Sequence, residues 1–570
     1  MRWHQWAFES IGLTLDVSTS YSGGAVPEFH RLPDSFASFN LRLSSNTTIG
    51  TSVGARFATM KPLETPPLGR VLMVQGTSSH AGKTTLVAAL CRLFSQMGYR
   101  VAPFKAQNMS NNAAVTADGG EVGRAQAMQA LAAGIDVTVD MNPVLLKPQS
   151  DNTSQIVVLG RAKHTRNARE YYALRDELWP VVTQALDRLR KTYDIVVVEG
   201  AGSPAEINLA QYDIVNMRIA RHADAPVLLV GDIERGGVFA SLYGTFALLT
   251  SEERALLRGF VINKFRGDAS LLDSGFDMLL ERTGVPTLGV LPYLDLSALP
   301  AEDAVDWGAS RANSEAVIDV AIMRLPRVAN LDEFQPLINE PSVRVRFIAN
   351  PDDMGAPDLV IIPGTKSTLG DLAWLRDRGL TDAIGSARTN GSLVLGICGG
   401  YQMLGEHITD RDGAEFAGAA PGLALLPVTT EFNPDKVTRR VRATVSSGCA
   451  LWTARSVGED IDGYEIHMGR TAVIPGATTA GPAFRISDAD DGLVSDDGTV
   501  IGTYMHGILE NAAIRRSLID HLARRKGVAV SSHGSKTIDE AFDALASSVA
   551  ANIDMSAICR IIGIGHGAAV

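Results

Sequence analysis

The sequence contains few cysteines, and their spacing excludes two common classes of protein. Only four occur among 570 residues, and they are widely scattered: Cys91, Cys398, Cys449 and Cys559. Neither a zinc site nor a disulfide framework has such spacing. We therefore expect the protein to work in a reducing compartment, the cytoplasm, where each thiol needs its own explanation.

Long uncharged apolar runs and an excess of positive charge are also absent. No apolar segment is long enough to span a bilayer, and the first residues lack the apolar core and cleavage site of a secretory signal. Because 52 Lys and Arg stand against 63 Asp and Glu, the net charge is −11. That balance gives no support to a nucleic-acid partner. These absences favour a small-molecule substrate and argue against a membrane or nucleic-acid partner.

A buried strand, a glycine-bounded turn and the start of a helix follow one another around the motif GKTT. Gly76 and Gly82 let the backbone curl so that successive N–H groups point inward, and Lys83 stands at the helix N-terminus, which favours an anion. The loop is a variant P-loop, because Thr77 occupies a glycine position of the strict motif. It predicts a nucleotide-phosphate site, with Lys83 at the terminal phosphates and Thr84 at Mg2+. The residues predicted to bind the nucleotide here are Gly76, Thr77, Gly82, Lys83, Thr84 and Thr85.

Further polar residues stand where apolar strands end. Glu199 follows the strand Ile195–Val198, and ligands of open α/β sheets bind at that edge. Glu199 is therefore predicted to face the metal, and the alternative is a solvated strand-end acid. Asn263 ends the strand Gly259–Asn263, where its amide can read a nucleobase edge, unless the segment is a turn with a solvated charge pair. Asp232 lies in a neighbouring polar loop and is a further candidate.

Amide side chains gather in two stretches, residues 104–112 and 147–155. Asn and Gln hydrogen-bond both carboxylate and amide groups, which suits a substrate that carries both. The alternative is a pair of long loops capped by their own Asx turns.

Short β-branched runs alternate with helical stretches through most of the chain, and this pattern predicts α/β domains with parallel sheets covered on both faces. We expect two helices at Glu121–Ala133 and Arg169–Lys191. The strands expected in the first sheet are Val71–Gln75, Val101–Lys105, Ile156–Leu159, Ile195–Val198, Val227–Val230, Gly259–Asn263 and Leu288–Leu291. Those expected in a second sheet are Val317–Met323, Val343–Ile348, Leu359–Ile362 and Leu393–Gly396, followed by hairpin-like segments.

Composition predicts where the domains begin and end. Residues 1–66 are rich in Ser, Thr, Gly and Pro without periodicity, so we expect a disordered extension and a functional product that starts at Met60. An acidic stretch without strand pattern separates a first domain, residues 67–310, from a second, residues 316–525. We assign residues 526–570 to a C-terminal tail.

The second domain contains a candidate nucleophile. Cys398 lies in a tight Gly-x-Cys-x-Gly turn between an apolar strand and a helix, which is the geometry of a nucleophile elbow. The helix N-terminus behind the sulfur favours the thiolate. His506 ends a strand and is the preferred base, with His467 as its rival. The segment Gly364–Thr368 offers backbone amides for an oxyanion hole. Cys91 has a helical apolar setting and is predicted to be a core residue.

The motif Gly396–Gln402 resembles the signature of class I glutamine amidotransferases, which have a flavodoxin-like fold. Its union with an N-terminal domain resembling dethiobiotin synthetase is similar to the cobyric acid synthase family of the cobalamin pathway. The likeness runs from about Gly69 to Leu522 and includes the stretches GTKST and YEIHMGR. It implies ATP and Mg2+ as cofactors. Position by position, it implies Cys398 as nucleophile, His506 as base, Lys83 and Thr84 at the phosphates, and Glu199 and Glu121 at Mg2+. Ile508 departs from the pattern, because triad amidotransferases place a Glu there.

The resemblance implies a reaction in two parts. ATP activates a corrinoid carboxylate as an acyl phosphate, and ammonia released from glutamine by the thiol displaces the phosphate, so that carboxylates b, d, e and g of adenosylcobyrinic acid a,c-diamide are amidated. The nearest alternative is a cobyrinic acid a,c-diamide synthase. A partitioning-type ATPase switch is disfavoured, since Ser78 stands where such switches carry a second Lys. A glutamine-sensing module is a further alternative.

Overall fold

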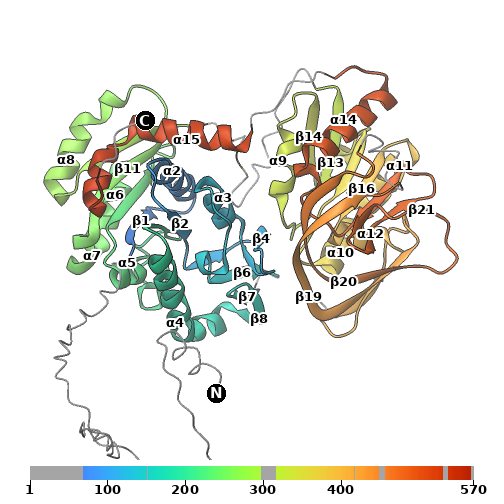
Figure 1. The fold of residues 1–570 in the computed structure, drawn as a ribbon, viewed down its shortest axis with the longest axis horizontal. Coiled ribbons are helices and arrows are strands. Elements are labelled where there is room, and N and C mark those ends of the chain that lie inside the picture. The colour runs from blue at the N-terminus through green and yellow to red at the C-terminus, as the bar shows by residue number, and fades with distance from the viewer. Residues whose placement is uncertain are drawn as a thin grey trace, which may run out of the picture. The chain divides into compact units, whose positions relative to one another are not determined.

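The computed structural model describes residues 68–149, 152–294, 296, 299, 316–415, 417–447, 456–530 and 537–565. The predicted N-terminal extension and the proposed start at Met60 lie outside these residues. Figure 1 shows the fold and labels many of its elements. In the described part of the chain, no helix combines the length and apolar character needed to cross a membrane.

A six-stranded, fully parallel sheet forms the framework of the first domain, in the order β12-β11-β10-β1-β9-β2. Its central strands are buried along almost their whole length, as the continuous apolar runs predicted. Six of the seven strands expected here are thereby confirmed. In chain order the strands are β1 (Arg70–Gly76), β2 (Val101–Phe104), β9 (Ile195–Glu199), β10 (Val227–Asp232), β11 (Leu257–Phe265) and β12 (Thr287–Pro292).

Helices cover this sheet and bury its apolar side chains in two core clusters. The predicted helix Arg169–Lys191 is confirmed as α4 (Ala168–Thr192), and Asn167 and Glu170 form a capping box at its start. The other helices are α2 (Lys83–Gln96), α3 (Arg124–Ala132), α5 (Met217–Ala223), α6 (Val238–Leu248), α7 (Ser251–Leu256) and α8 (Asp273–Thr283).

Two predictions for this domain are wrong in part. The run Ile156–Leu159 does not join the parallel sheet: β7 (Thr153–Val158) lies antiparallel to its neighbours in a four-stranded sheet, β3-β6-β7-β8. The helix expected from Glu121 begins only at Arg124, because Glu121–Gly123 forms β5 and pairs with β4. The remaining bounds are β3 (Gln107–Met109), β4 (Ala113–Val115), β6 (Val144–Pro148) and β8 (Arg161–Asn167).

The second domain contains a seven-stranded sheet in the order β14-β13-β15-β16-β25-β24-β21, whose first five strands are parallel. The four predicted strands are confirmed as β13 (Ile318–Met323), β14 (Val343–Ile348), β15 (Leu359–Ile362) and β16 (Leu393–Ile397), and β25 spans Val500–Thr503. The antiparallel strands β21 (Thr479–Gly481) and β24 (Leu493–Ser495) complete the sheet. Its helices are α9 (Gln335–Ile338), α10 (Thr368–Asp377), α11 (Leu380–Thr389), α12 (Gly399–Leu404) and α14 (Ala512–Lys526).

Several of the predicted hairpin segments lie in a second sheet of this domain, β18-β17-β19-β22-β23. Its longest strand, β19 (Val428–Val445), also pairs antiparallel with β20 (Asp460–Val473). The shorter strands are β17 (His407–Asp410), β18 (Gly418–Pro421), β22 (Phe484–Ile486) and β23 (Ala489–Asp491).

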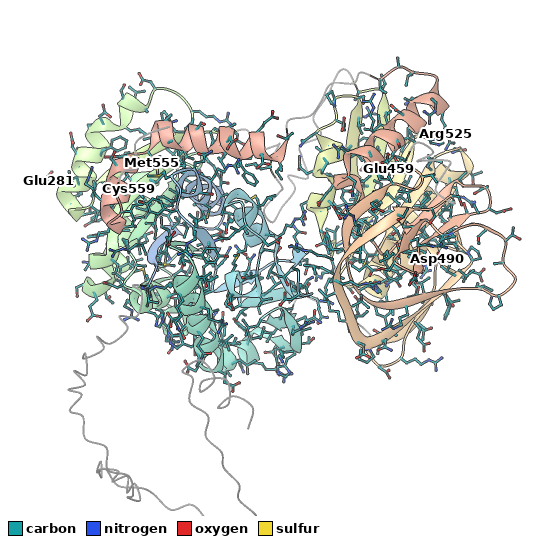
Figure 2. The ribbon with its side chains drawn as sticks, in the orientation of Figure 1. Glu281, Glu459, Asp490, Arg525, Met555 and Cys559 are labelled. Carbon is teal, nitrogen blue, oxygen red and sulfur yellow. The ribbon has the colours of Figure 1, made fainter. Side chains whose placement is uncertain are left out.

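The end of the chain returns to the first domain. Helix α15 (Ile538–Asn552) buries Phe542, and α16 (Met555–Ile562) buries Ile558, in the same cluster as α2; Figure 1 shows α15 beside that helix. Arg92 of α2 donates to Asp543 of α15 at 2.7 Å. Figure 2 labels Cys559 on α16, where the thiol is free and buried. Residues 538–562 therefore complete a core whose other members lie hundreds of residues earlier.

Candidate active sites

The predicted phosphate loop connects β1 to α2. Gly82 has a φ of +93° immediately before the helix, a conformation that favours glycine over other residues. The Lys83 ammonium donates to the carbonyl oxygens of Ser78 at 2.9 Å and Gly202 at 3.2 Å. The loop thus holds a buried cation at the start of a helix, an arrangement that suits the phosphates of a nucleotide.

Glu199 lies beside this loop and is buried, so it is not the solvated strand-end acid of the alternative interpretation. Its carboxylate accepts from the Thr84 hydroxyl at 2.9 Å and from the Gln129 amide at 2.6 Å, and it pairs with the Lys105 ammonium at 2.6 Å. A hydroxyl and a carboxylate in contact fit the oxygen donors of a Mg2+ ion that also binds phosphates. Among the described residues, no group of three or more His, Cys, Asp or Glu side chains is arranged to hold a metal.

Asn263 contacts the loop itself. Its Nδ2 donates to the Ala81 carbonyl at 2.9 Å, and its Oδ1 accepts from the Lys264 backbone amide at 2.8 Å. The Lys264 ammonium pairs with Asp232 at 2.8 Å. These contacts brace the loop, and recognition of a nucleobase by Asn263 stays a prediction.

Glu121 has partners different from those of Glu199. Its buried carboxylate forms ion pairs with Lys147 and, at 2.5 Å, with Lys436. Burial alone raises the pKa of Glu121, but the two ammonium groups outweigh it and hold the pKa well below its usual range. Because Lys436 belongs to β19, this carboxylate ties the two domains together. Binding of Mg2+ by Glu121 stays a prediction.

The amide-rich stretches lie partly in strands. Residues 107–109 form β3 and residues 144–148 form β6, and these strands pair with each other. Two of the amide side chains contact the second domain: Asn112 accepts from the Leu331 amide at 3.3 Å, and Gln155 accepts from Lys436 at 3.4 Å.

Cys398 joins β16 to α12 with a φ of 52°, which is strained for a residue other than glycine. The small neighbours of the thiol are required by the packing, since a Cβ on Gly400 would collide with the carbonyl oxygen of Ile362. This is the backbone of a nucleophile elbow. The thiol lies 3.5 Å from the Ile466 carbonyl oxygen.

His506 follows β25 and lies beside this thiol. Its Nδ1 is 3.0 Å from Oε1 of Glu333, and the other oxygen of Glu333 accepts from the Gly507 amide at 3.1 Å. Burial alone lowers the pKa of His506, but the charges of Glu333 and Cys398 and hydrogen bonds to both raise it to about 10. The imidazole is therefore held between a carboxylate and a thiol.

His467, the rival base, has a different environment. Its Nδ1 is 2.8 Å from the Gly469 carbonyl oxygen, and its ring stacks on Tyr504 with centroids 3.9 Å apart. Burial lowers the pKa of His467. This ring is fixed as a neutral wall of the thiol pocket.

Much of the predicted oxyanion loop is occupied by internal contacts. The amides of Lys366, Ser367 and Thr368 donate to Arg327, Thr365 and Glu415. Gly364 is packed against the thiol and the imidazole, because a Cβ there would meet His506 and Cys398. Gly364 therefore closes one side of the pocket.

Glu333 was missed by the sequence analysis. It lies in the one-turn helix η4 (Leu331–Phe334), 173 positions before His506, and no spacing rule connects such positions. Two signs were present. Ile508 stands where the triad pattern places the acid that orients the imidazole, and Asp332 and Glu333 stand between the apolar residues Leu331 and Phe334.

A pocket surrounds the thiol and is lined by residues of both domains. From the second domain come Cys398, His506, His467 and Gln402, and from the first comes Lys147. Three lysines border it, and Lys366, one of them, has a pKa lowered by burial. Such a pocket suits a small polar substrate with an anionic group.

Two protein families match this chain. Residues 72–305 match the CobQ/CobB/MinD/ParA nucleotide binding domain, and residues 319–514 match the CobB/CobQ-like glutamine amidotransferase domain. Together with the geometry, these matches define the class of the protein: a P-loop nucleotide-binding domain joined to a glutamine amidotransferase domain.

Full-length relatives narrow the identification. A cobyric acid synthase of Sorangium cellulosum is 51% identical over 86% of this chain and 98% of its own length, and one of Dehalococcoides mccartyi is 48% identical over 87% and 100%. The chain belongs to the cobyric acid synthase family, whose members are glutamine-dependent amidoligases. Among solved structures, PurLQS from Thermotoga maritima is 19% identical over 36% of this chain and 99% of its own, with a TM-score of 0.29.

Proposed function

We propose that this enzyme amidates the b, d, e and g carboxylates of adenosylcobyrinic acid a,c-diamide to give adenosylcobyric acid, with ATP and glutamine as co-substrates. One observation supports this proposal. The chain, which belongs to this family, contains both a phosphate loop beside the buried Glu199 and a thiol, that of Cys398, beside the His506 imidazole. The first site can activate a substrate carboxylate, and the second can release ammonia from glutamine.

In the first domain, Lys83 would hold the terminal phosphates of ATP, and Thr84 and Glu199 would hold Mg2+, which neutralises phosphate charge when it is bound. A substrate carboxylate attacks the terminal phosphorus and forms an acyl phosphate, with ADP as the leaving group. Ammonia then attacks the acyl carbon and expels inorganic phosphate, which leaves an amide. The phosphate is needed because a carboxylate is otherwise a poor acceptor of ammonia.

In the second domain, the thiol of Cys398 passes its proton to His506, whose pKa is raised to about 10, and the resulting thiolate attacks the side-chain amide carbon of glutamine. The carbon–nitrogen bond breaks, His506 returns the proton to the departing nitrogen, and ammonia is released. Water then cleaves the thioester to glutamate. Glu333 acts as a positioning residue, because its contact with Nδ1 turns the other ring nitrogen toward the thiol.

The test is a product analysis. The protein is incubated with ATP, glutamine and the a,c-diamide, and mass spectrometry should reveal one shift for each of the b, d, e and g carboxylates. Amidation of the a and c carboxylates of unamidated cobyrinic acid would instead identify a cobyrinic acid a,c-diamide synthase. Cys398→Ala should abolish turnover with glutamine and leave turnover with ammonium salts. Loss of both would contradict the scheme of two sites.

A further inference from the structure

Arg124 is the first residue of α3 in the nucleotide-binding domain, yet its guanidinium contacts the amidotransferase domain. Its Nε lies 2.5 Å from Oδ2 of Asp332, and one terminal nitrogen lies 2.5 Å from Oε1 of Glu510. Asp332 is the neighbour of Glu333, and Glu510 lies four residues after His506. The Arg124 side chain thus contacts both the segment that contains Glu333 and the segment that contains His506.

A third contact leads to the same ring. The Arg124 guanidinium lies 5.9 Å from the centroid of the Tyr464 ring. Tyr464 stacks on the His506 imidazole with centroids 5.2 Å apart and planes 12° apart, and the two residues exchange backbone hydrogen bonds. Tyr464 packs against one face of the His506 ring and also contacts the Arg124 guanidinium.

The segment that carries Glu333 has a second tie to the first domain. The backbone amide of Ala113 donates to Oδ1 of Asn330 at 3.0 Å. Asn330 has a φ of 56°, and its Nδ2 lies 3.5 Å from Nδ1 of His506. Residues 330–333 are thus held on one side by the nucleotide-binding domain and on the other by the imidazole.

We propose that Arg124 is a positioning residue for glutamine hydrolysis, supplied by the domain that does not contain the thiol. The proposal rests on the proposed function, since it assumes that Cys398 and His506 hydrolyse glutamine. The planar guanidinium donates a hydrogen bond to Glu510 and forms an ion pair with Asp332, so one cation is shared between two carboxylates, whereas a lysine in its place offers a point charge without that planar shape. Arg124 therefore fixes the relative position of Glu333 and His506.

The same helix reaches the nucleotide site. Gln129, five residues after Arg124 in α3, donates to Oε2 of Glu199 at 2.6 Å. One rigid element thereby contacts both sites. It follows that the thiol site is fully assembled only when α3 is docked, so that ammonia is released where it can be used.

The experiment compares Arg124→Gln with Arg440→Gln in the full-length protein. Arg440 crosses between the same domains, donating to the Val115 carbonyl at 2.7 Å and pairing with Asp136 at 3.0 Å, but it belongs to neither site. Arg124→Gln should lower kcat for glutamate release by about tenfold or more and leave KM within about threefold, because misplacement of a base affects the reacting geometry. Amidation with ammonium salts should persist. Arg440→Gln should stay within about twofold in both assays.

Two further variants guard against misfolding. Asp332→Asn has the shape of the native residue and should lower kcat in the same direction, and Arg124→Lys should restore only part of the rate. The proposal is overturned if Arg440→Gln loses as much glutamine hydrolysis as Arg124→Gln, if the loss lies in KM, or if ammonium-dependent amidation falls in parallel. A wild-type protein without glutamine hydrolysis would instead contradict the proposed function.

Discussion

The two sites of this molecule are built in different ways. At the nucleotide site, Lys83 and Thr84 belong to one short motif, and Glu199 stands at the end of the adjacent strand β9. At the thiol site, Cys398, His506 and Glu333 come from three segments separated by up to 173 positions. A phosphate loop works through consecutive backbone groups, so its residues must be contiguous. A thiol and its base require only that three side chains meet in space, so any topology that brings them together is sufficient.

This difference extends to how each region is stabilised. The apolar core around the thiol comes from one continuous segment, residues 318–523, whereas the core around the nucleotide site needs helices from the far end of the chain. We expect Phe542→Ala to destabilise the nucleotide region by about 3–5 kcal/mol, the usual cost of truncating a fully buried phenylalanine. Hydrogen exchange read by mass spectrometry should show faster exchange in α2 and unchanged exchange in α12. Ile538→Ala, at a partly exposed position of the same helix, is the control. Equal losses in α2 and α12 would show that the two regions unfold as one.

Lys83→Ala separates the two chemistries. The substitution removes the ammonium group that would contact the terminal phosphates of ATP. The rate of amidation should fall at least about a hundredfold with glutamine or with ammonium salts, because no hydrogen-bond donor then stabilises the charge that develops on the transferring phosphoryl group. Hydrolysis of glutamine should continue at its basal rate. Lys191→Ala, an exposed residue of α4, is the control. Amidation that survives in Lys83→Ala would remove this loop from the reaction.

Glu333→Gln tests the part of the thiol site that the sequence did not indicate. Loss of the carboxylate should lower kcat for glutamine hydrolysis by about a hundredfold, as expected when a base loses its orienting acid. The pH profile should also change. The pKa of His506 is raised to about 10 partly by Glu333, so the charged pair persists below that value in the wild type. In the variant the pKa falls, and the basic limb of the profile should move to lower pH.

The control for this variant is Glu340→Gln, which removes a nearby acid paired with Arg515 at 2.8 Å. Glu333→Asp should recover part of the rate, because it restores the charge at a shorter reach. An unchanged pH profile in Glu333→Gln would mean that the carboxylate does not control the imidazole.

Local patterns predicted much of the fold because apolar runs and glycine turns act over a few residues. The parallel strands of both main sheets and the helix α4 follow from such patterns. The run at Ile156 was assigned to the wrong sheet, since a buried strand has the same apolar composition in parallel and antiparallel pairing. The helix predicted from Glu121 begins three residues later, because residues 121–123 pair with β4. Tertiary contacts determine the sheet that Ile156 joins and the residue at which α3 begins, and they also determine where α15 packs.

The same reasoning applies to the sites. The motifs around Lys83 and Cys398 are contiguous, and they placed candidate residues at strand ends. Glu333 meets His506 only through the arrangement of β13 and β25 in the folded sheet, and Arg124 meets Asp332 only through the contact between domains. Spacing along the chain contains no information about either pair.

The smallest expected effect distinguishes the two buried acids. Glu199→Gln should raise the Mg2+ concentration needed for half-maximal amidation by about tenfold, because a carboxylate donor beside Thr84 is lost. Glu121→Gln should raise that concentration by less, since two ammonium groups, those of Lys147 and Lys436, already neutralise its carboxylate, whereas Glu199 pairs with that of Lys105. Titration of amidation with Mg2+, using ammonium salts to bypass the thiol, measures both. An equal shift in the two variants would make Glu121 a metal ligand after all and would place an acid of the interdomain contact in the nucleotide site.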